Sequence, residues 1–270
     1  MTLAGHLQLS TIKKSERSIV SSCYYKGAFK VTRPVYLEDE QLTVYLMHVG
    51  GGYVDGDRYL TEIEVGEEAE LTLTTQSYTK VYRTPNHPVH QQVIIHLKPN
   101  STLEYLPDPL IAYEGAKFIQ ETNVSLREGT CLFYKDILTP GWAEDGRLFR
   151  YDWIRSRLRV YKNEKLVLFD HLFLEPNEAF TGILELEGYS HFGTFLIFHD
   201  WIDRKLKERL DVFVDELDSN VRFGSSLLPE GGLVLRAFAF NTHSIDTFFS
   251  EVHVWMKERL LKKEPIFLRK

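Results

Sequence analysis

The segment Gly50–Asp57 contains the residue types that come nearest to a phosphate-binding or metal-binding motif. In the frame of a P-loop, Gly51 and Gly56 fall at the glycine positions, but Asp57 stands where a lysine must meet the phosphates. Its negative charge would repel them. In the frame of an EF-hand, the glycine at position six is missing and Gly66 replaces the bidentate glutamate. The segment therefore predicts neither nucleotide binding nor calcium binding.

Histidine and serine motifs elsewhere also fall short of a catalytic or metal site. Gly188–Gly193 resembles a nucleophile elbow around Ser190, but its second glycine comes one residue late, so we predict an ordinary turn before a strand. His87 and His90 lie in a proline-bearing segment without the helix that would align two imidazoles, and a surface loop is the better interpretation. Single histidines in strand patterns, such as His48 and His96, are typical of structural residues.

Paired carboxylates cannot be identified from spacing in a β protein, because folding decides which side chains meet. A glycosidase therefore stays open as an alternative. Cys23 and Cys131 are far apart in the sequence and belong to no cysteine or histidine cluster, which argues against a disulfide framework and a structural zinc site.

Short β-strands, which the sequence pattern predicts, would have to position the residues discussed above. From Val31 to about Leu174, apolar and polar residues alternate with period two, and Gly, Pro, Asn or Asp separates the runs. Strands at this spacing without intervening helices favour stacked sheets or a β-solenoid over βαβ units. The clearest runs are 42–46, 62–65, 71–74, 92–97, 103–105, 132–134 and 158–161.

Two amphipathic helices interrupt this pattern in the C-terminal half. The first is expected after an N-cap at Asp200, with apolar residues from Ile202 to Leu217 at helical spacing. The second is expected from Ser244, where one apolar stripe includes Phe248 and Trp255. A strand over 233–240 separates them. We expect one domain over residues 1–270, mainly β, with stacked β-sheets of solenoid-like (β-helical) type and these two helices.

Composition limits the classes of protein and partner. Hydrophobic residues make up 43% and charged residues 26% of the chain, which is typical of a globular protein. The formal net charge of −6 disfavours nucleic acid as a partner. The sequence shows neither a signal-peptide pattern at its N-terminus nor an apolar run of bilayer length, so we expect a cytoplasmic protein without a membrane partner.

Three motifs closely resemble the urease accessory protein UreD family, whose members are called UreH in some bacteria. They are GGYVDGDR at residues 51–58, LTTQSYTKVYRT at 73–84 and LEYLPDPLI at 103–111. The order and spacing of the motifs also match, and the likeness extends from Lys30 to the C-terminal helix.

This resemblance implies a urease maturation chaperone without catalysis of its own. Family members bind UreF, which recruits the GTPase UreG, and the assembly docks on apo-urease and assists nickel insertion. The resemblance also implies a solenoid-like fold with a pair of helices, no tightly bound cofactor, transient contact with nickel, and a dimer of heterocomplexes as one assembly state.

Site residues follow from the resemblance by motif position. A transit path for nickel carries over onto Asp57, Thr79, Asp136 and Asp170 as a set, whereas for each residue alone a structural role is the favoured interpretation. Carboxylates suit transit better than storage, because nickel prefers imidazole and thiolate for tight binding. The residues that carry either partner binding or structural roles in the motifs are Gly51, Gly52, Gly56, Thr74, Thr75, Gln76, Lys80, Tyr82, Arg83 and Glu104.

One loop departs from the family pattern. Many members carry Gly-Arg and then Gly-Glu where this chain has the segment Gly141–Arg147, so the role of this loop is left open. The rival class is a β-sandwich that binds carbohydrate through its tyrosines, with the glycosidase beside it.

Overall fold

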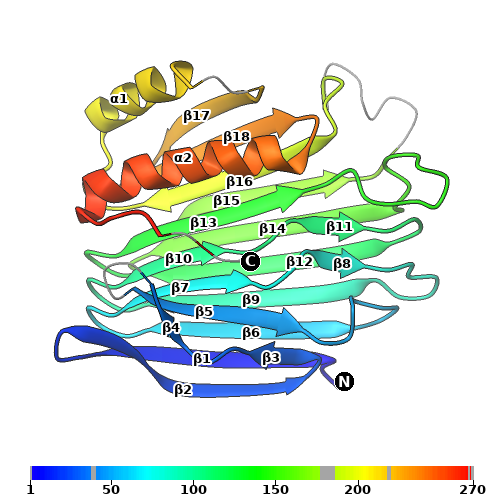
Figure 1. Ribbon diagram of the computed structural model, residues 1–270, viewed down its shortest axis with the longest axis horizontal. Helices are drawn as coiled ribbons and strands as arrows, with labels where there is room; N and C mark the ends of the chain where they lie inside the picture. Colours follow the sequence, from blue (N-terminus) through cyan, green and yellow to red (C-terminus); the bar gives the residue numbers. More distant parts are fainter. Residues whose placement is uncertain (1, 38–40, 177–185, 218–219, 267, 269–270) are drawn as a thin grey trace.

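The computed structural model describes residues 2–37, 41–176, 186–217, 220–266 and 268. Most of the described residues form two large β-sheets, and two helices accompany them (Figure 1). This arrangement confirms the mainly β prediction.

Sheet A has seven strands. In spatial order they are β15 (Lys165–Leu174), β14 (Trp153–Lys162), β12 (Lys117–Leu126), β9 (Val89–Leu97), β6 (Arg58–Val65), β1 (Gly5–Lys14) and β2 (Arg17–Gly27).

Sheet B has a longer path and three short strands beside it. Its strands in spatial order are β17 (Arg222–Leu228), β18 (Gly232–Ala239), β16 (His191–Phe198), β13 (Cys131–Leu138), β10 (Thr102–Leu106), β7 (Glu70–Thr75), β5 (Leu42–His48) and β3 (Phe29–Val31). Beside this path, β4 (Val35–Tyr36) pairs with β5, and β8 (Thr79–Val81) pairs with β11 (Leu110–Ala112), which also contacts β13.

The chain winds between the two sheets as a solenoid. From β5 to β14 it places its long strands alternately in sheet B and sheet A, and each strand runs parallel to the one laid down a turn earlier. β8 and β11 occupy equivalent connections in successive turns and stack on each other. The predicted solenoid-like stacking is therefore confirmed, and antiparallel strands flank the parallel coils.

Two hydrophobic cores hold these layers together. One fills the space between the sheets and includes Leu71, Val93 and Leu103. The other lies on the opposite face of sheet B, under the helices, and includes Phe133 and Phe249. Because the centre of sheet B is buried on both faces, every residue of β10 is buried, whereas buried and half-buried residues alternate along β12.

The helices are α1 (Arg204–Asp215) and α2 (Thr242–Leu261). Figure 1 shows α2 lying across sheet B, where it contacts β13, β16 and β18. Among the described residues, neither helix has both the length and the apolar composition needed to cross a membrane.

Both helices begin at different residues from those predicted. The predicted cap at Asp200 is wrong: Asp203 caps α1 and accepts a hydrogen bond from the backbone N–H of Leu206. Asp200 lies in a turn and forms an ion pair with Lys162 at 2.5 Å, so its side chain has a tertiary partner instead. Asn241 caps α2, which starts two residues before the predicted Ser244.

The strands β1 and β2 were not predicted, because the strand pattern was traced only from Val31. β2 is the edge strand of sheet A, and from Ser21 to Gly27 all of its residues are exposed. An exposed edge strand does not need an apolar face, so the period-two signal is weak there.

Candidate functional site

Three cavities adjoin one another between the sheets. The loop cavity has a volume of about 150 Å³, the central cavity about 40 Å³ and the β15 cavity about 20 Å³. The loop and central cavities share the side chains of Phe29, Leu46, Tyr53, Thr75 and Thr79. The central and β15 cavities share Tyr134 and Asp136. Because neighbouring cavities share lining residues, the three cavities follow one another in a row inside the solenoid, separated by side chains.

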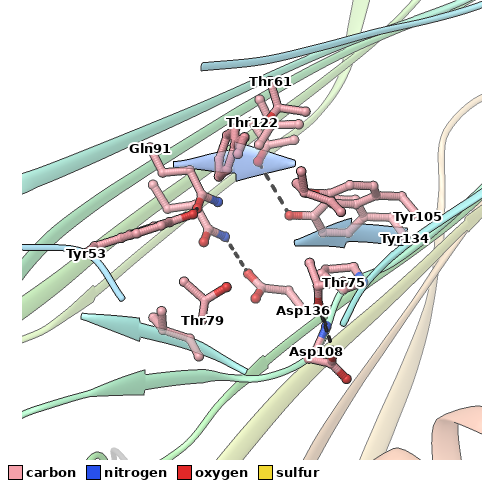
Figure 2. Close-up of a pocket in the computed structure, with 16 residues that line it drawn as sticks. Tyr53, Thr61, Thr75, Thr79, Gln91, Tyr105, Asp108, Thr122, Tyr134 and Asp136 are labelled. Atoms are coloured by element: carbon pink, nitrogen blue, oxygen red, sulfur yellow. Dashed lines mark hydrogen bonds between the residues drawn. The ribbon is translucent and has the colours of Figure 1, made fainter. Parts of the chain in front are cut away.

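Hydroxyl, amide and carboxyl groups line the central cavity together with apolar side chains (Figure 2). Burial raises the pKa of Tyr105 and of Tyr134, so both phenols are neutral at ordinary pH. At about 30 Å³ for each water molecule, the cavity has room for about one. Its polar lining residues are Tyr53, Thr61, Thr75, Thr79, Gln91, Tyr105, Asp108, Gln120, Thr122, Tyr134 and Asp136.

Asp136 lies where the central and β15 cavities meet. Its Oδ2 accepts a hydrogen bond of 2.8 Å from the amide of Gln120 on the facing sheet. Burial raises the pKa of Asp136 to about 6; the bond from Gln120 opposes the rise, and the charge of Asp170 adds to it. The carboxyl group therefore exchanges its proton near neutral pH and can present either a proton or a negative charge to the cavities.

Asp170 lines only the β15 cavity. Its Oδ1 accepts a hydrogen bond of 2.6 Å from the guanidinium of Arg236, which reaches it from β18 in sheet B. This ion pair compensates the charge of Asp170, so a cation at this end of the row would have to compete with Arg236.

Thr79 lies at the other end of the central cavity, on β8, and lines the loop cavity as well. The predicted path residues Thr79, Asp136 and Asp170 thus follow one another along the row of cavities. Asp57 does not line any of the three: its Oδ2 accepts hydrogen bonds from the hydroxyl of Tyr59 at 2.7 Å and from the N–H of Val54 at 2.9 Å.

Gly51 and Gly52 line the loop cavity, with backbone φ of +78° and +154°, respectively. A β-carbon at Gly52 would lie 2.9 Å from the carbonyl oxygen of Lys80, so this position needs glycine for space as well as for conformation. Gly56 has φ of +75° in the same connection between β5 and β6.

The threonine motif joins β7 to the LPDP segment. Thr74 is buried and donates a hydrogen bond of 2.6 Å to the carbonyl of Leu106. Thr75 donates to Asp108 at 2.8 Å and accepts from the backbone N–H of Asp108 at the same distance. Both threonines therefore have structural hydrogen bonds, and Thr75 also lines the loop and central cavities.

The remaining motif residues lie nearer to the surface. Gln76 is exposed and its backbone N–H donates to the carbonyl of Leu46. Lys80 lines the loop cavity, and the hydroxyl of Tyr82 reaches the carbonyl of Gly51 at 3.3 Å. Arg83 is exposed. Among the motif residues, Gly51, Gly56, Gln76 and Arg83 are exposed and Lys80 and Tyr82 are half-buried, so these positions are accessible to a partner protein.

Glu104 lies apart from the other motif residues. It is on the face of β10 that α2 covers, it has 0% of its area exposed, and it pairs with His253 and Lys257. A partner cannot reach it in this conformation, so its position supports the structural reading of the motif.

Several residues of the site escaped sequence reasoning. Gln120 reaches Asp136 from the facing sheet, Tyr53 lines two cavities, and His48 lines the loop cavity. The alternation along β12 could have indicated Gln120, because this residue falls at a buried position, where a polar side chain needs a hydrogen-bond partner. Among the described residues, no three of His, Cys, Asp and Glu gather closely enough to hold a metal ion.

The fold and the cavities define a β-solenoid protein with a row of three partly polar cavities in its interior. Comparison with known proteins then identifies its family. The family model described as "UreD urease accessory protein" matches residues 3–270, and the chain belongs to that family.

Curated relatives span the whole chain. The chain is 56% identical over 270 residues to urease accessory protein UreD of Bacillus sp. (strain TB-90), with 100% of both chains covered. It is 41% identical to the protein of the same name from Lachnoclostridium phytofermentans, with 98% of both covered. It is 36% identical to that of Staphylococcus aureus (strain bovine RF122 / ET3-1), with 98% of this chain and 97% of the relative covered.

Proposed function

We propose that this protein assists urease maturation in the cytoplasm as a scaffold without catalysis of its own. It joins UreF, and through UreF the GTPase UreG, to apo-urease, and it assists nickel insertion into the urease active site. Membership in the UreD urease accessory protein family supports the role in maturation.

The row of three cavities is the observation that carries the nickel part of the proposal. Nickel is the cargo here, and its route passes from the loop cavity by Thr79 to Asp136 and on to Asp170. The lining of the central cavity is rich in oxygen atoms and contains neither histidine nor cysteine. Because nickel binds tightly to imidazole and thiolate, an oxygen lining releases the ion readily.

The electrostatics of Asp136 fit a transit role. With a pKa of about 6, the carboxyl group is mostly ionised at pH 7 and offers a charge to an arriving cation, and a modest fall in pH protonates it and helps to release the cation. Asp57 acts differently: it holds Tyr59 beside the loop cavity and stays outside the row.

The two rival functions lack comparable support. The central cavity of about 40 Å³ and the β15 cavity of about 20 Å³ hold water-sized species, whereas a sugar ring needs several times more room. Asp136 and Asp170, the carboxylates that share the β15 cavity, are therefore poorly placed to act as a glycosidase pair.

The test begins with a urease operon from which this gene has been deleted. Urease activity in extracts is measured across added nickel concentrations after complementation with wild-type protein. We expect activity at ordinary nickel concentrations to require the gene. Retained activity in the deletion strain under those conditions would overturn the proposal.

The route is tested with the triple variant D57A/D136A/D170A and with D136N alone. We expect lower urease activation from both, with unchanged recovery of UreF and urease in a pull-down. Asp145→Asn is the matched control, because Asp145 pairs with Arg147 on an exposed loop away from the cavities. Full activation by the triple variant would end the idea of this route.

A further inference from the structure

The strand β15 is the last strand of sheet A, whereas sheet B continues past it with β18 and β17 (Figure 1). β15 lies opposite β16, since Asp170 lines one cavity together with Thr194 of β16. Among the described residues, no strand of sheet A therefore lies opposite β18. On the face of β18 that points towards sheet A, Val234 is only half-buried and Arg236 is 47% exposed. Sheet A thus has an open strand position beside β15.

The free edge of β15 can pair with a further strand. The backbone groups on the outer side of this ten-residue strand have no strand partner in the part of the chain that the structure describes. Proteins usually protect such an edge with proline, with charged side chains or by keeping the strand short. β15 is long, contains no proline, and its only acidic side chain, that of Asp170, points inward to a cavity. Extended segments of partner proteins commonly bind by adding a strand to an edge of this kind.

Three arginines lie on the outer face of β14, the strand next to this edge. They are Arg155, Arg157 and Arg159, which alternate along the strand. The register places Glu121 of β12 beside Arg157, and the two side chains form an ion pair at 3.4 Å. The same register gives Arg155 and Arg159 uncharged neighbours on β12, and neither pairs with a carboxylate among the described residues. Two positive charges on this face are therefore uncompensated.

Aromatic rings hold both uncompensated guanidinium groups beside β15. The guanidinium carbon of Arg159 lies 5.2 Å from the ring centre of Phe169, and that of Arg155 lies 5.4 Å from the ring centre of Phe173 and 5.6 Å from that of Trp153. The two phenylalanines are 52% and 44% exposed. A guanidinium group that stacks on a ring keeps its N–H donors free for a carboxylate. Arginine and aromatic residues are also the types enriched at protein interfaces.

We propose that the open position beside β15 binds an extended acidic segment of a partner protein, which adds a strand to sheet A and places two carboxylates against Arg155 and Arg159. The two arginines are four residues apart on one strand, a separation of roughly 13 Å at about 3.3 Å per residue. Two carboxylates four residues apart in an extended segment have the same separation and lie on the same face. The side chains between them point to the other face and cover β18. This inference does not depend on the proposed function.

Charge favours this occupant over a second copy of the chain and over nucleic acid. A second copy would bring the same two uncompensated arginines to the joint, and like charges repel each other. The net charge of −6 opposes the approach of a phosphate backbone. An acidic protein segment compensates both arginines and also satisfies the edge of β15.

Binding of designed peptides to the purified chain tests the proposal. The probe is a short fluorescent peptide with valine at every second position and two glutamates four residues apart on the other face. In the comparison peptide both glutamates are replaced by glutamine. By fluorescence anisotropy we expect the glutamate peptide to bind about tenfold more tightly at low salt, and this advantage should shrink at high salt, which screens exposed charges. Equal affinities for the two peptides at low salt would overturn the proposal.

A double variant locates the binding site. Arg155→Gln combined with Arg159→Gln should lose the preference for the glutamate peptide, while thermal unfolding shows that the variant is folded. Arg58→Gln is the matched control, because Arg58 is exposed at the start of β6 in the same sheet, with β9 and β12 between it and β14. This control should bind both peptides like the wild type. An unchanged preference in the double variant would contradict the assignment to this face.

Hydrogen exchange tests the addition of a strand separately from the charges. The glutamate peptide should slow exchange of backbone amides in residues 165–174, because the new strand pairs with the free edge of β15. Binding without this protection would overturn strand addition. Tighter binding of single-stranded DNA or of phosphatidylglycerol vesicles than of the glutamate peptide would overturn the choice of a protein segment. Dimerisation of the chain that blocks the peptide, measured by light scattering, would assign the edge to a second copy instead.

Discussion

Oε1 of Glu104 on β10 lies 2.9 Å from Nζ of Lys257 on α2, and the two side chains are 0% and 1% exposed. Nε2 of His253, one helical turn before Lys257, lies 3.1 Å from the other carboxylate oxygen. Both contacts are short, and they set the buried carboxylate of Glu104 against two basic side chains of α2. The carboxylate ties α2 to the centre of sheet B.

Removal of Glu104 should destabilise the protein strongly. Glu104→Ala leaves the ammonium group of Lys257 buried without its counter-charge, and we expect a loss of about 3–5 kcal/mol in the free energy of unfolding, measured by urea denaturation. Glu114→Ala is the matched control, because Glu114 pairs with Arg150 at 3.3 Å and both side chains are exposed, at 49% and 40%. It should cost less than about 1 kcal/mol. Equal losses would contradict the role of buried charge.

Stability in acid should depend on Glu104. Burial acts to raise the pKa of this carboxyl group, but the proximity of His253 and then of Lys257 outweighs it and lowers the pKa to about 2 from 4.5. A carboxyl group whose folded pKa is depressed stabilises the fold above its unfolded pKa and loses that contribution as pH falls from about 4.5 towards 2. As pH falls through this range, the free energy of unfolding of Glu104→Gln should therefore decrease by roughly 3 kcal/mol less than that of the wild type.

Asp136 should have the opposite dependence on pH. Its pKa is raised from 3.8 to about 6, mainly by burial, so the folded state holds a proton that the unfolded chain has released, and stability falls as pH rises from about 4 to 6. Asp136→Asn should leave stability unchanged near pH 4 and raise it by about 2 kcal/mol at pH 7. Thermal unfolding at both pH values checks the sign. A variant less stable than the wild type at pH 7 would contradict the buried-acid interpretation.

The two glycines of the loop cavity should respond differently to a methyl group. At Gly52, with φ of +154°, a β-carbon would lie 2.7 Å from the ring of Tyr82 and 2.9 Å from the carbonyl of Lys80. Gly52→Ala should lose about 3 kcal/mol of stability, since backbone strain and overpacking add. At Gly51, with φ of +78°, nothing lies within 4 Å, so Gly51→Ala should cost only about 1 kcal/mol. Similar melting temperatures for the two variants would contradict the close approach at Gly52.

Much of the architecture could be predicted from the sequence, because its signals are local. Period-two runs such as 71–74 and 103–105 correspond to β7 and β10, and the apolar stripe with Phe248 and Trp255 corresponds to α2. The first residue of α1 could not be predicted as well, because Asp200 and Asp203 both precede the helix and either aspartate is a suitable N-cap residue. The ion pair of Asp200 with Lys162, a tertiary contact, distinguishes the two.

The motif residues could be found by resemblance, but not their neighbours. Sequence placed Glu104 and Asp136 among the residues of interest without showing that one is sealed under α2 and the other opens on two cavities. The alternation of polar and apolar residues assigns each side chain to one of the two faces of its strand. The winding of the chain into a solenoid determines which other segments cover each face.

His48 shows the same limit most clearly. In the sequence it is a histidine at the end of a strand, for which a structural role is the ordinary interpretation. Its contact with the hydroxyl of Tyr59, which donates to Asp57, forms because the solenoid brings these two residues beside it from the next strand and its preceding turn. Local sequence thus determined which segments are strands and helices, because backbone periodicity is a short-range property. Which polar groups share a cavity was decided only by the tertiary structure, because those contacts form between coils that stack after each strand already exists.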